Sequence, residues 1–378
     1  MSTGQVLSHS QLTNLMLTGP THKQRKLIWL EITGAKAQMR DNAGYYELLL
    51  TWKGSAQTQF SAQIDKDLQR TYPEEGFLAM PGAMQSLRNV LVAYSWRNPS
   101  IGYCQGMNFI AGRLLSFGFS EEQAFWMLAQ ILETYLPLDY FSVMTGVLTD
   151  QKVFHSLLKL HVPRVAKHLQ QHSIDPSMYC VQWLVCIFAY TFRRDIVMRI
   201  WDVFFVEGSA FLFRVGLGLM HLLRDDILDI DSEEGLIVAL EKVAMRVDDP
   251  DEVLQAASLD KFMLKNKHIR DLRAQYRAKV MEDLCLLPPP LPRMGAIGET
   301  RGRNSFLALS SPHIQVIEDY VLMERGKRVV EVTAAPLRDL LIGRKDRVAS
   351  FPAIRRFRTV DESRDADSQD SGDSTSQE

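Results

Sequence analysis

The feature that most constrains this chain is an apolar pattern with the period of an α-helix, repeated from about residue 20 to residue 284. In residues 60–71, Ile64 and Leu68 recur at a spacing of four among charged and polar residues, so they share one helical face. Ser120 and Gln123 have the spacing of an N-terminal capping box ahead of another apolar face. Alternating strand patterns are scarce, and we therefore expect an all-α fold.

The boundaries of the expected helices follow from this period and from the residues that stop it. One helix ends near Gly34, Pro137 closes the helix that follows Ser120, and Pro163 is expected to kink or split another. The remaining helices are predicted over residues 152–172, 178–192, 196–206, 210–224, 232–246, 254–266 and 269–284.

Prolines indicate where the helical domain ends. Regular structure should stop at the run of Pro288, Pro289, Pro290 and Pro292. Residues 361–378 are acidic, rich in serine and without aromatic residues, so we expect this tail to be disordered. We divide the chain into an N-terminal segment (1–18), a helical domain (19–285), and a Pro-rich linker with a C-terminal extension (286–378).

The charge of the chain is nearly balanced, with 43 Lys and Arg against 45 Asp and Glu and a formal net charge of −2. This balance argues against a nucleic-acid partner or a bulk anionic membrane, and it leaves any charged partner to a local patch. Residues 1–10 lack the pattern of a secretory signal, and the four cysteines contain no C-x-x-C pair. We expect a cytoplasmic protein with reduced, mostly buried thiols.

One uncharged, strongly apolar stretch, residues 176–192, requires comparison with a membrane span. About 20 apolar residues are needed to cross a bilayer, and this stretch is shorter and contains Gln182. We therefore predict a buried core helix and no transmembrane segment.

The first candidate functional residues are Asp67 and Arg70, which lie three apart in the pattern I-x-x-D-x-x-R-T over residues 64–71. Residues three apart share a helical face, so the two can pair. A carboxylate beside a guanidinium can fix its planar fork, which is the orientation that an arginine needs to bind phosphate oxygens. Taken alone, the pair is also typical of a surface salt bridge.

The second group surrounds Gln105, in the pattern Y-x-Q-G-M that begins at Tyr103. Gly102 and Gly106 on either side permit close backbone approach to another surface. A glutamine amide can accept a hydrogen bond from a water and donate one to a phosphate oxygen, so it can orient an attacking water. The alternative is a loop glutamine that caps the helix expected near Met107.

Together these two patterns, in which Gln105 follows Arg70 by 35 positions, resemble the signature motifs of the TBC family of Rab GTPase-activating proteins. One departure is Lys26, which follows Arg25 where the family usually has glycine, and it concerns only the first helix. The resemblance extends over about residues 19–284 through Gly19, Pro20, Trp29, Gly34, Trp183, Phe188, residues 200–202 and residues 207–208.

The resemblance implies a two-lobed helical domain that is not itself an enzyme but activates a GTP-bound Rab-family GTPase in vesicle trafficking. Arg70 would neutralise charge on the transferring γ-phosphoryl group, and Gln105 would position the water. Asp67 would orient Arg70, while Tyr103, Gly106 and Met107 would shape the loop that presents Gln105. The chain would need no cofactor of its own, because GTP and Mg²⁺ arrive with the partner, which would also recruit it peripherally to the cytosolic face of an endomembrane.

Two alternative hypotheses about the function remain open. The chain could be a scaffold or effector that binds Rab-GTP in the same groove without accelerating hydrolysis, although a pure binder has no need of both Arg70 and Gln105. Alternatively, residues beyond Pro292 could recruit a partner while the helical domain serves as a support.

Other residue patterns point to no further chemistry. His168 and His172 lie four apart, but no third ligand stands near them, so no metal site is expected. The chain lacks a phosphate-binding G-x-x-x-x-G-K-[ST] loop and is therefore not expected to be a GTPase itself.

Overall fold

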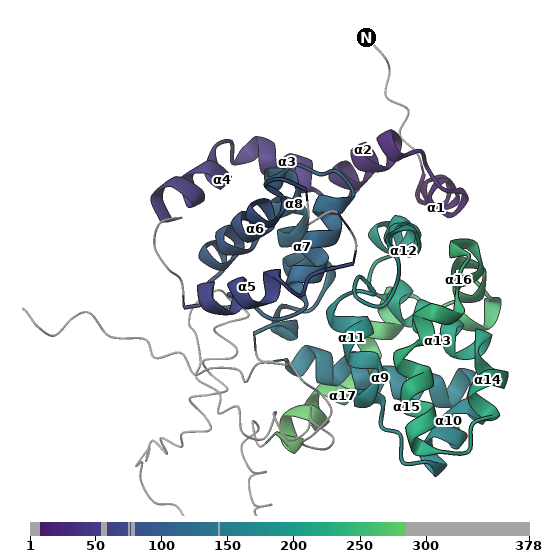
Figure 1. The fold of residues 1–378 in the computed structure, drawn as a ribbon. Coiled ribbons are helices and arrows are strands. Elements are labelled where there is room, and N and C mark those ends of the chain that lie inside the picture. The colour runs from purple at the N-terminus through teal and green to yellow at the C-terminus, as the bar shows by residue number, and fades with distance from the viewer. Residues whose placement is uncertain (1–7, 54–58, 75, 77–79, 143, 285–378) are drawn as a thin grey trace, which may run out of the picture.

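The computed structural model describes residues 8–284 apart from 54–58, 75, 77–79 and 143, and this part of the chain is helical and contains no β-strand. The expected all-α fold is confirmed. The helices form two lobes that lie side by side (Figure 1). Within the described residues, no helix is both long and apolar enough to cross a lipid bilayer.

The first lobe is built around α6, α7 and α8, which pack against one another, while α3 and α5 cover them (Figure 1). The capping box predicted at Ser120 and Gln123 is confirmed at the start of α8. The elements of this lobe are α2 (His22–Ile32), α3 (Ala35–Asp41), α4 (Tyr45–Leu48), η1 (Leu49–Lys53), α5 (Ser61–Leu68), α6 (Ala83–Arg97), α7 (Met107–Ser116), α8 (Glu121–Gln130), η2 (Ile131–Tyr135) and η3 (Leu138–Tyr140).

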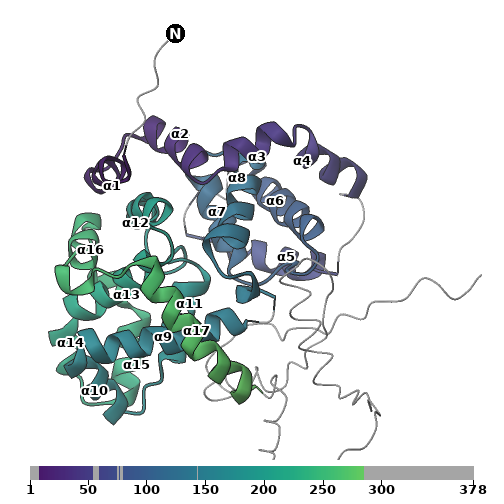
Figure 2. The same cartoon turned by 180° about the vertical axis from the view of Figure 1, so that it is seen from behind.

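In the second lobe α13 packs against α16, and α17 lies along α9 (Figure 2). Pro163 splits the expected helix over residues 152–172 into α9 and α10, as predicted. The elements are α9 (Thr145–His161), α10 (Pro163–Gln171), η4 (Pro176–Met178), α11 (Cys180–Val185), α12 (Arg194–Glu207), α13 (Ala210–Leu222), α14 (Arg224–Leu228), α15 (Glu233–Glu241), η5 (Val243–Arg246), α16 (Pro250–Ala257), η6 (Asp260–Phe262) and α17 (Asn266–Asp283), with α1 (His9–Thr18) packed on α12.

A buried ion pair joins the two lobes. Arg25 of α2 donates from Nε and Nη2 to the two carboxylate oxygens of Asp202 on α12, at 2.7 and 2.9 Å. Trp29 Nε1 donates to the same carboxylate at 3.0 Å, and Arg199 Nη1 lies 3.2 Å from it. Because every oxygen of this buried carboxylate has a charged or N–H partner, the arrangement fixes α2 against α12.

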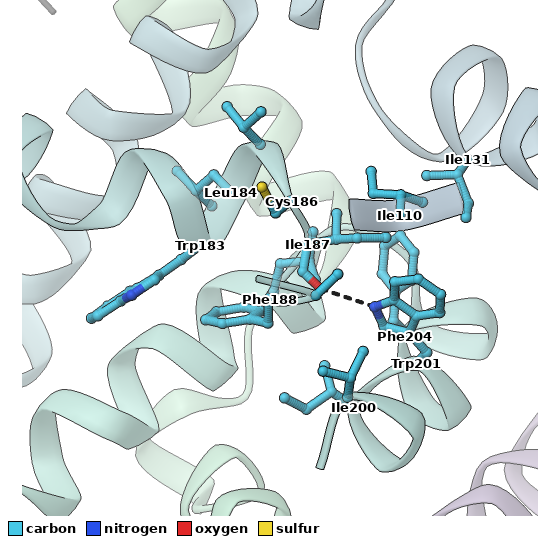
Figure 3. Close-up of a cluster of buried hydrophobic side chains, with 14 of the residues drawn as sticks. Ile110, Ile131, Trp183, Leu184, Cys186, Ile187, Phe188, Ile200, Trp201 and Phe204 are labelled. Atoms are coloured by element: carbon cyan, nitrogen blue, oxygen red, sulfur yellow. Dashed lines mark hydrogen bonds between the residues drawn. The ribbon is translucent and has the colours of Figure 1, made fainter. Parts of the chain in front are cut away.

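The predicted helix over residues 178–192 is wrong in its second half. The helix α11 ends at Val185, and Ile187 and Phe188 take positive φ values of 42° and 64°. Backbone carbonyls of this segment accept hydrogen bonds from side chains far away in the sequence. Trp201 Nε1 donates to Ile187 O at 2.9 Å (Figure 3), and Arg113 Nη2 donates to Ala189 O at 3.1 Å. The segment is nevertheless mostly buried, as expected, because side chains from other helices replace the backbone hydrogen bonds of a continuing helix.

The predicted helix over residues 254–266 is also wrong, since α16 ends at Ala257 and η6 follows it. Arg214 Nε donates to the carbonyl of Ala257 at 3.0 Å, which satisfies a group at the helix end. A Cβ on Gly218 of α13 would lie 2.8 Å from the backbone nitrogen of Ala257, so the backbones of α13 and α16 are in direct contact there. Close packing on α13 therefore stops α16 where the sequence pattern alone continues.

The domain limits predicted from the sequence remain predictions. The described residues end at Leu284, and the Pro-rich linker, the C-terminal extension and the acidic tail lie outside them, as does Cys285. Of the other thiols, Cys180 and Cys186 are buried and Cys104 is partly buried, and all three are free.

Candidate functional site

Arg70 lies just beyond the C-terminal end of α5, and its pairing with Asp67 is as predicted. Arg70 Nη2 is 2.5 Å from Asp67 Oδ1. The Arg70 side chain is 35% exposed, whereas that of Asp67 is completely buried. This is not a solvated surface salt bridge, because the carboxylate is held inside the protein and only the guanidinium reaches solvent.

The Asp67 carboxylate is held in place by neutral donors on both sides. Gln63 Nε2 donates to Oδ1 at 3.0 Å, and the Tyr103 hydroxyl donates to Oδ2 at 2.6 Å. Burial, together with the charge of Asp67, raises the pKa of Tyr103 well above its usual value, so the hydroxyl keeps its proton and stays a donor. The carboxylate that orients Arg70 is thus fixed from the segment that carries Gln105.

Gln105 is presented by a tight turn that ends in Gly106, immediately before α7. Gly106 has φ 112°, and a Cβ there would lie 2.6 Å from Val185 Cγ1. Gly102 has φ 64°, and a Cβ there would lie 1.9 Å from the Phe60 ring. Both positions therefore require glycine for conformation and for space, and they pack the turn directly against α11 and the start of α5.

A second connection joins the two groups through Thr71 and Asn108. Asn108 Nδ2 donates to Thr71 Oγ1 at 2.8 Å, and Asn108 Oδ1 accepts from the backbone N–H of Gly106 at 3.0 Å. Thr71 Oγ1 in turn donates to Asp67 O at 2.6 Å. The residue after Arg70 and the residue after Gln105 are therefore linked by one buried side chain.

Two polar atoms at this site have no hydrogen-bond partner among the described residues: Arg70 Nε and Gln105 Oε1, both shielded from solvent. A buried polar atom without a partner costs about 1–3 kcal/mol, so most proteins satisfy such atoms. Gln105 does not cap α7, because the N-cap is Gly106 and makes no side-chain capping bond. The site therefore contains one buried donor and one buried acceptor that no described residue pairs.

The remaining predicted supporting residues belong to the same turn. Met107 is completely buried, and its Sδ lies 3.5 Å from the Cys104 N–H. Burial, with a contribution from Asp67, raises the pKa of the Cys104 thiol to about 12, so it is neither a nucleophile nor an anion at neutral pH. The structure therefore brings together all six predicted residues, which are Asp67, Arg70, Tyr103, Gln105, Gly106 and Met107.

Sequence reasoning missed Thr71, Asn108 and Gln63 as parts of the site. Thr71 and Asn108 are visible in the sequence as neighbours of the two motifs, but their contact spans 37 positions along the chain. Gln63 lies one turn before Asp67 on α5, and this spacing of four was the available signal.

His168 and His172, from which the sequence predicts no metal site, lie close together on and just after α10. The rings of His168 and His172 have centroids 4.7 Å apart, and His168 Nε2 lies 2.9 Å from the carbonyl of Ile230. Among the described residues there is no group of three His, Cys, Asp or Glu side chains placed to hold a metal ion.

Comparison with known proteins gives the class to which this arrangement belongs. Residues 22–228 match the Rab-GTPase-TBC domain, and the chain is a member of this family. Among its relatives, human Small G protein signaling modulator 3 is 34% identical over 276 residues, which cover 72% of this chain and 37% of that protein. TBC1 domain family member 2B of Xenopus tropicalis is 34% identical over 283 residues, which cover 73% of this chain and 30% of that protein. The chain thus matches only about a third of these relatives' length.

Solved structures agree with this assignment. The Chlamydomonas flagellar RabGAP TBC domain superposes with a TM-score of 0.62 at 27% identity, over 67% of this chain and 85% of that one. The Ypt/Rab-GAP domain of Gyp1p superposes with a TM-score of 0.57 at 17% identity, over 72% of this chain and 95% of that one, and supports the fold alone.

Proposed function

We propose that this protein is a GTPase-activating protein for a Rab-family GTPase and supplies Arg70 and Gln105 in trans to the nucleotide of its partner. The observation that carries the proposal is the pair of open polar atoms, Arg70 Nε and Gln105 Oε1, presented by two segments that are hydrogen-bonded to each other. Membership of the Rab-GTPase-TBC family and the names of the relatives support a Rab partner.

In this mechanism Arg70 stabilises the charge that develops on the γ-phosphoryl group. Asp67 contacts the terminal nitrogen Nη2 of the guanidinium, while Nε has no partner among the described residues and can donate to a phosphate oxygen. The fixed carboxylate already restricts the conformations of the Arg70 side chain, so less conformational entropy is lost when Arg70 binds the nucleotide. The guanidinium charge is therefore oriented before the partner arrives. In the Ras case an arginine supplied by an activator contributes about 10³–10⁵ in rate.

Gln105 orients the attacking water. Its open Oε1 accepts a hydrogen bond from that water, and its Nε2 donates to a phosphate oxygen, which aligns the water with the bond to be broken. The glycine turn at Gly106 and the buried Met107 fix the backbone from which Gln105 projects. GTP and Mg²⁺ belong to the partner GTPase, and this chain needs no cofactor for the step.

The test is single-turnover GTP hydrolysis across a panel of purified Rabs, with wild-type protein, Arg70→Ala and Gln105→Ala side by side. We expect acceleration of at least one Rab, lost in both variants although both keep the melting temperature of the wild type. Stable binding of a Rab-GTP without acceleration by the wild type would refute the proposal in favour of a scaffold or effector. The same panel would identify the partner, and with it the membrane at which the protein is recruited.

A further inference from the structure

Positive charge is concentrated on two segments of the second lobe, residues 159–164 and 259–268. Five exposed cations lie on them, and Asp260 is the only carboxylate within either segment. None of these cations forms an ion pair within the described part of the chain, unlike Arg97 with Glu133 in the first lobe. The five are Lys159, Arg164, Lys261, Lys265 and Lys267. A protein with net charge −2 therefore carries a locally basic surface.

The two segments meet at Phe262 and the C-terminal end of α13, and the second segment then runs along α13 to its start, where Asn266 Nδ2 donates to Glu207 O at 2.6 Å. The ring of buried Phe262 lies between His161 and His221, at centroid distances of 5.9 and 5.8 Å. Lys261 Nζ is 4.9 Å from the Phe262 centroid and lies 3.0 and 3.1 Å from the two ring nitrogens of His221. We call residues 159–164, residues 259–268 and His221 the cationic face.

Lys261 and His221, at the centre of the cationic face, both have lowered pKa values, and burial is the largest cause at each. Burial and the neighbouring Arg224 lower the pKa of Lys261, and burial, Lys261 and Arg224 lower the pKa of His221. Asp225 opposes this effect at His221, but it also pairs with Arg224 at 3.2 Å. An anion bound here would offset the repulsion from Arg224.

Apolar side chains project from the same segments. Leu160 is 69% exposed and Met263 is 56% exposed, and each is next in sequence to a residue of the cluster around Phe262. A free polyanion offers nothing to exposed apolar side chains. A lipid surface accommodates both, since cations meet headgroup phosphates while leucine and methionine enter the interface.

We propose that the cationic face binds the surface of a membrane that contains anionic phospholipids. In both views α10 and α14, which border this face, lie at the opposite end of the molecule from α5, near which Arg70 and Gln105 are found (Figures 1 and 2). The domain can therefore contact lipid with one lobe while it presents Arg70 and Gln105 from the other. This contact is independent of recruitment through a GTPase.

The experiment is flotation of the full-length chain with vesicles of phosphatidylcholine alone or with about 30% phosphatidylserine, an amount sufficient for a strongly anionic surface. We expect binding only to the anionic vesicles, decreasing with salt. Each cation near such a surface changes partition about fivefold, so Lys265→Glu with Lys267→Glu should weaken it about 25-fold or more. Leu160→Ser with Met263→Ser should weaken the binding that persists at high salt.

The matched control is Lys23→Glu with Lys242→Glu, two exposed lysines outside the cationic face, which make the same change in net charge. It should retain wild-type partition, and all variants should share the wild-type melting temperature. Equal losses in the control and test variants, or undiminished binding by Lys265→Glu with Lys267→Glu, would overturn the proposal. Binding to heparin without any binding to anionic vesicles would overturn it as well, in favour of a soluble polyanion.

Discussion

Among the buried aspartates that pair with arginines, Asp202 and Asp67 leave their arginines in opposite states. Asp202 receives two nitrogens from Arg25, and Arg199 and Trp29 bind the same carboxylate, so both sides of the contact are occupied. Asp67 receives one terminal nitrogen of Arg70, whose Nε stays open and whose side chain remains about a third exposed. Arg25 is thus bound within the protein by two of its nitrogens, whereas Arg70 is oriented but keeps an unpaired donor that, on the proposed function, a phosphate of the partner would use.

The largest effect that this comparison predicts is at Arg70. Arg70→Ala should lower the single-turnover rate of activated hydrolysis by about 10³–10⁵, because the charge on the transferring phosphoryl group loses its partner. Arg70→Lys should recover little, since an ammonium cannot reproduce the planar two-point contact. The free energy of unfolding should fall by less than the about 3–5 kcal/mol expected when a buried charge loses its partner, because Gln63 and Tyr103 still donate to the Asp67 carboxylate. High activity of Arg70→Lys would contradict the proposed geometry.

At Arg25 the effect should be on stability instead. Arg25→Ala deprives the buried Asp202 carboxylate of its bidentate partner, and we expect the free energy of unfolding to fall by about 3–5 kcal/mol. Urea unfolding measures this loss. The control is Arg193→Ala, whose exposed pairs with Asp195 and Asp248 should be worth less than about 1 kcal/mol. Similar losses of unfolding free energy in Arg25→Ala and Arg193→Ala would contradict the stabilising role assigned to the Arg25–Asp202 pair.

A smaller effect should follow from Tyr103→Phe, which removes the hydroxyl that holds Asp67. A hydrogen bond to a charged group contributes about 1.5–3 kcal/mol, so kcat should fall at least about tenfold while KM for the Rab stays unchanged. The matched control is Tyr46→Phe, which removes a hydroxyl bound to Glu121 at 2.8 Å in the same lobe. If Tyr46→Phe lowers kcat equally, Tyr103 has no special part in positioning Arg70.

The smallest effect concerns the pH dependence of the free energy of unfolding. Burial raises the pKa of Asp202 above its usual value in spite of Arg25 and Arg199. The folded protein therefore binds this proton more tightly than the unfolded chain, and the stability that Asp202 contributes is present at low pH and lost as pH rises through the raised pKa. The difference in unfolding free energy between wild type and Asp202→Asn should decrease from pH 4 upward. An increase would mean that the ion pairs outweigh burial.

The sequence was sufficient for the fold class and for the pairing of Asp67 with Arg70, because both depend on short spacings. The period of 3.6 predicted the helices, and the spacing of three predicted the contact between Asp67 and Arg70. The end of α11 could not be predicted, because it depends on Trp201 and Arg113, donors that are remote from the 178–192 pattern.

The same limit explains what was missed at the site and between the lobes. Asn108 reaches Thr71 across 37 positions, and Arg25 reaches Asp202 across 177. A single sequence contains both members of each pair but nothing that shows their contact. The basic surface around Phe262 was missed for this reason as well, since its segments are separated by about a hundred residues and only the balanced total charge is visible.

The carbonyl of Ala189 has a consequence for the order of assembly. The Tyr72 hydroxyl, two residues after Arg70, lies 2.8 Å from Phe109 O and 2.9 Å from Ala189 O, and the latter contact spans 117 positions. Tyr72 itself has φ 48°, a backbone conformation that such distant contacts have to maintain. During synthesis the arginine segment therefore emerges long before its anchor, and contacts of such separation form late. Competence to meet a GTPase should thus appear only after the second lobe has folded, even though Arg70 and Gln105 both lie in the first.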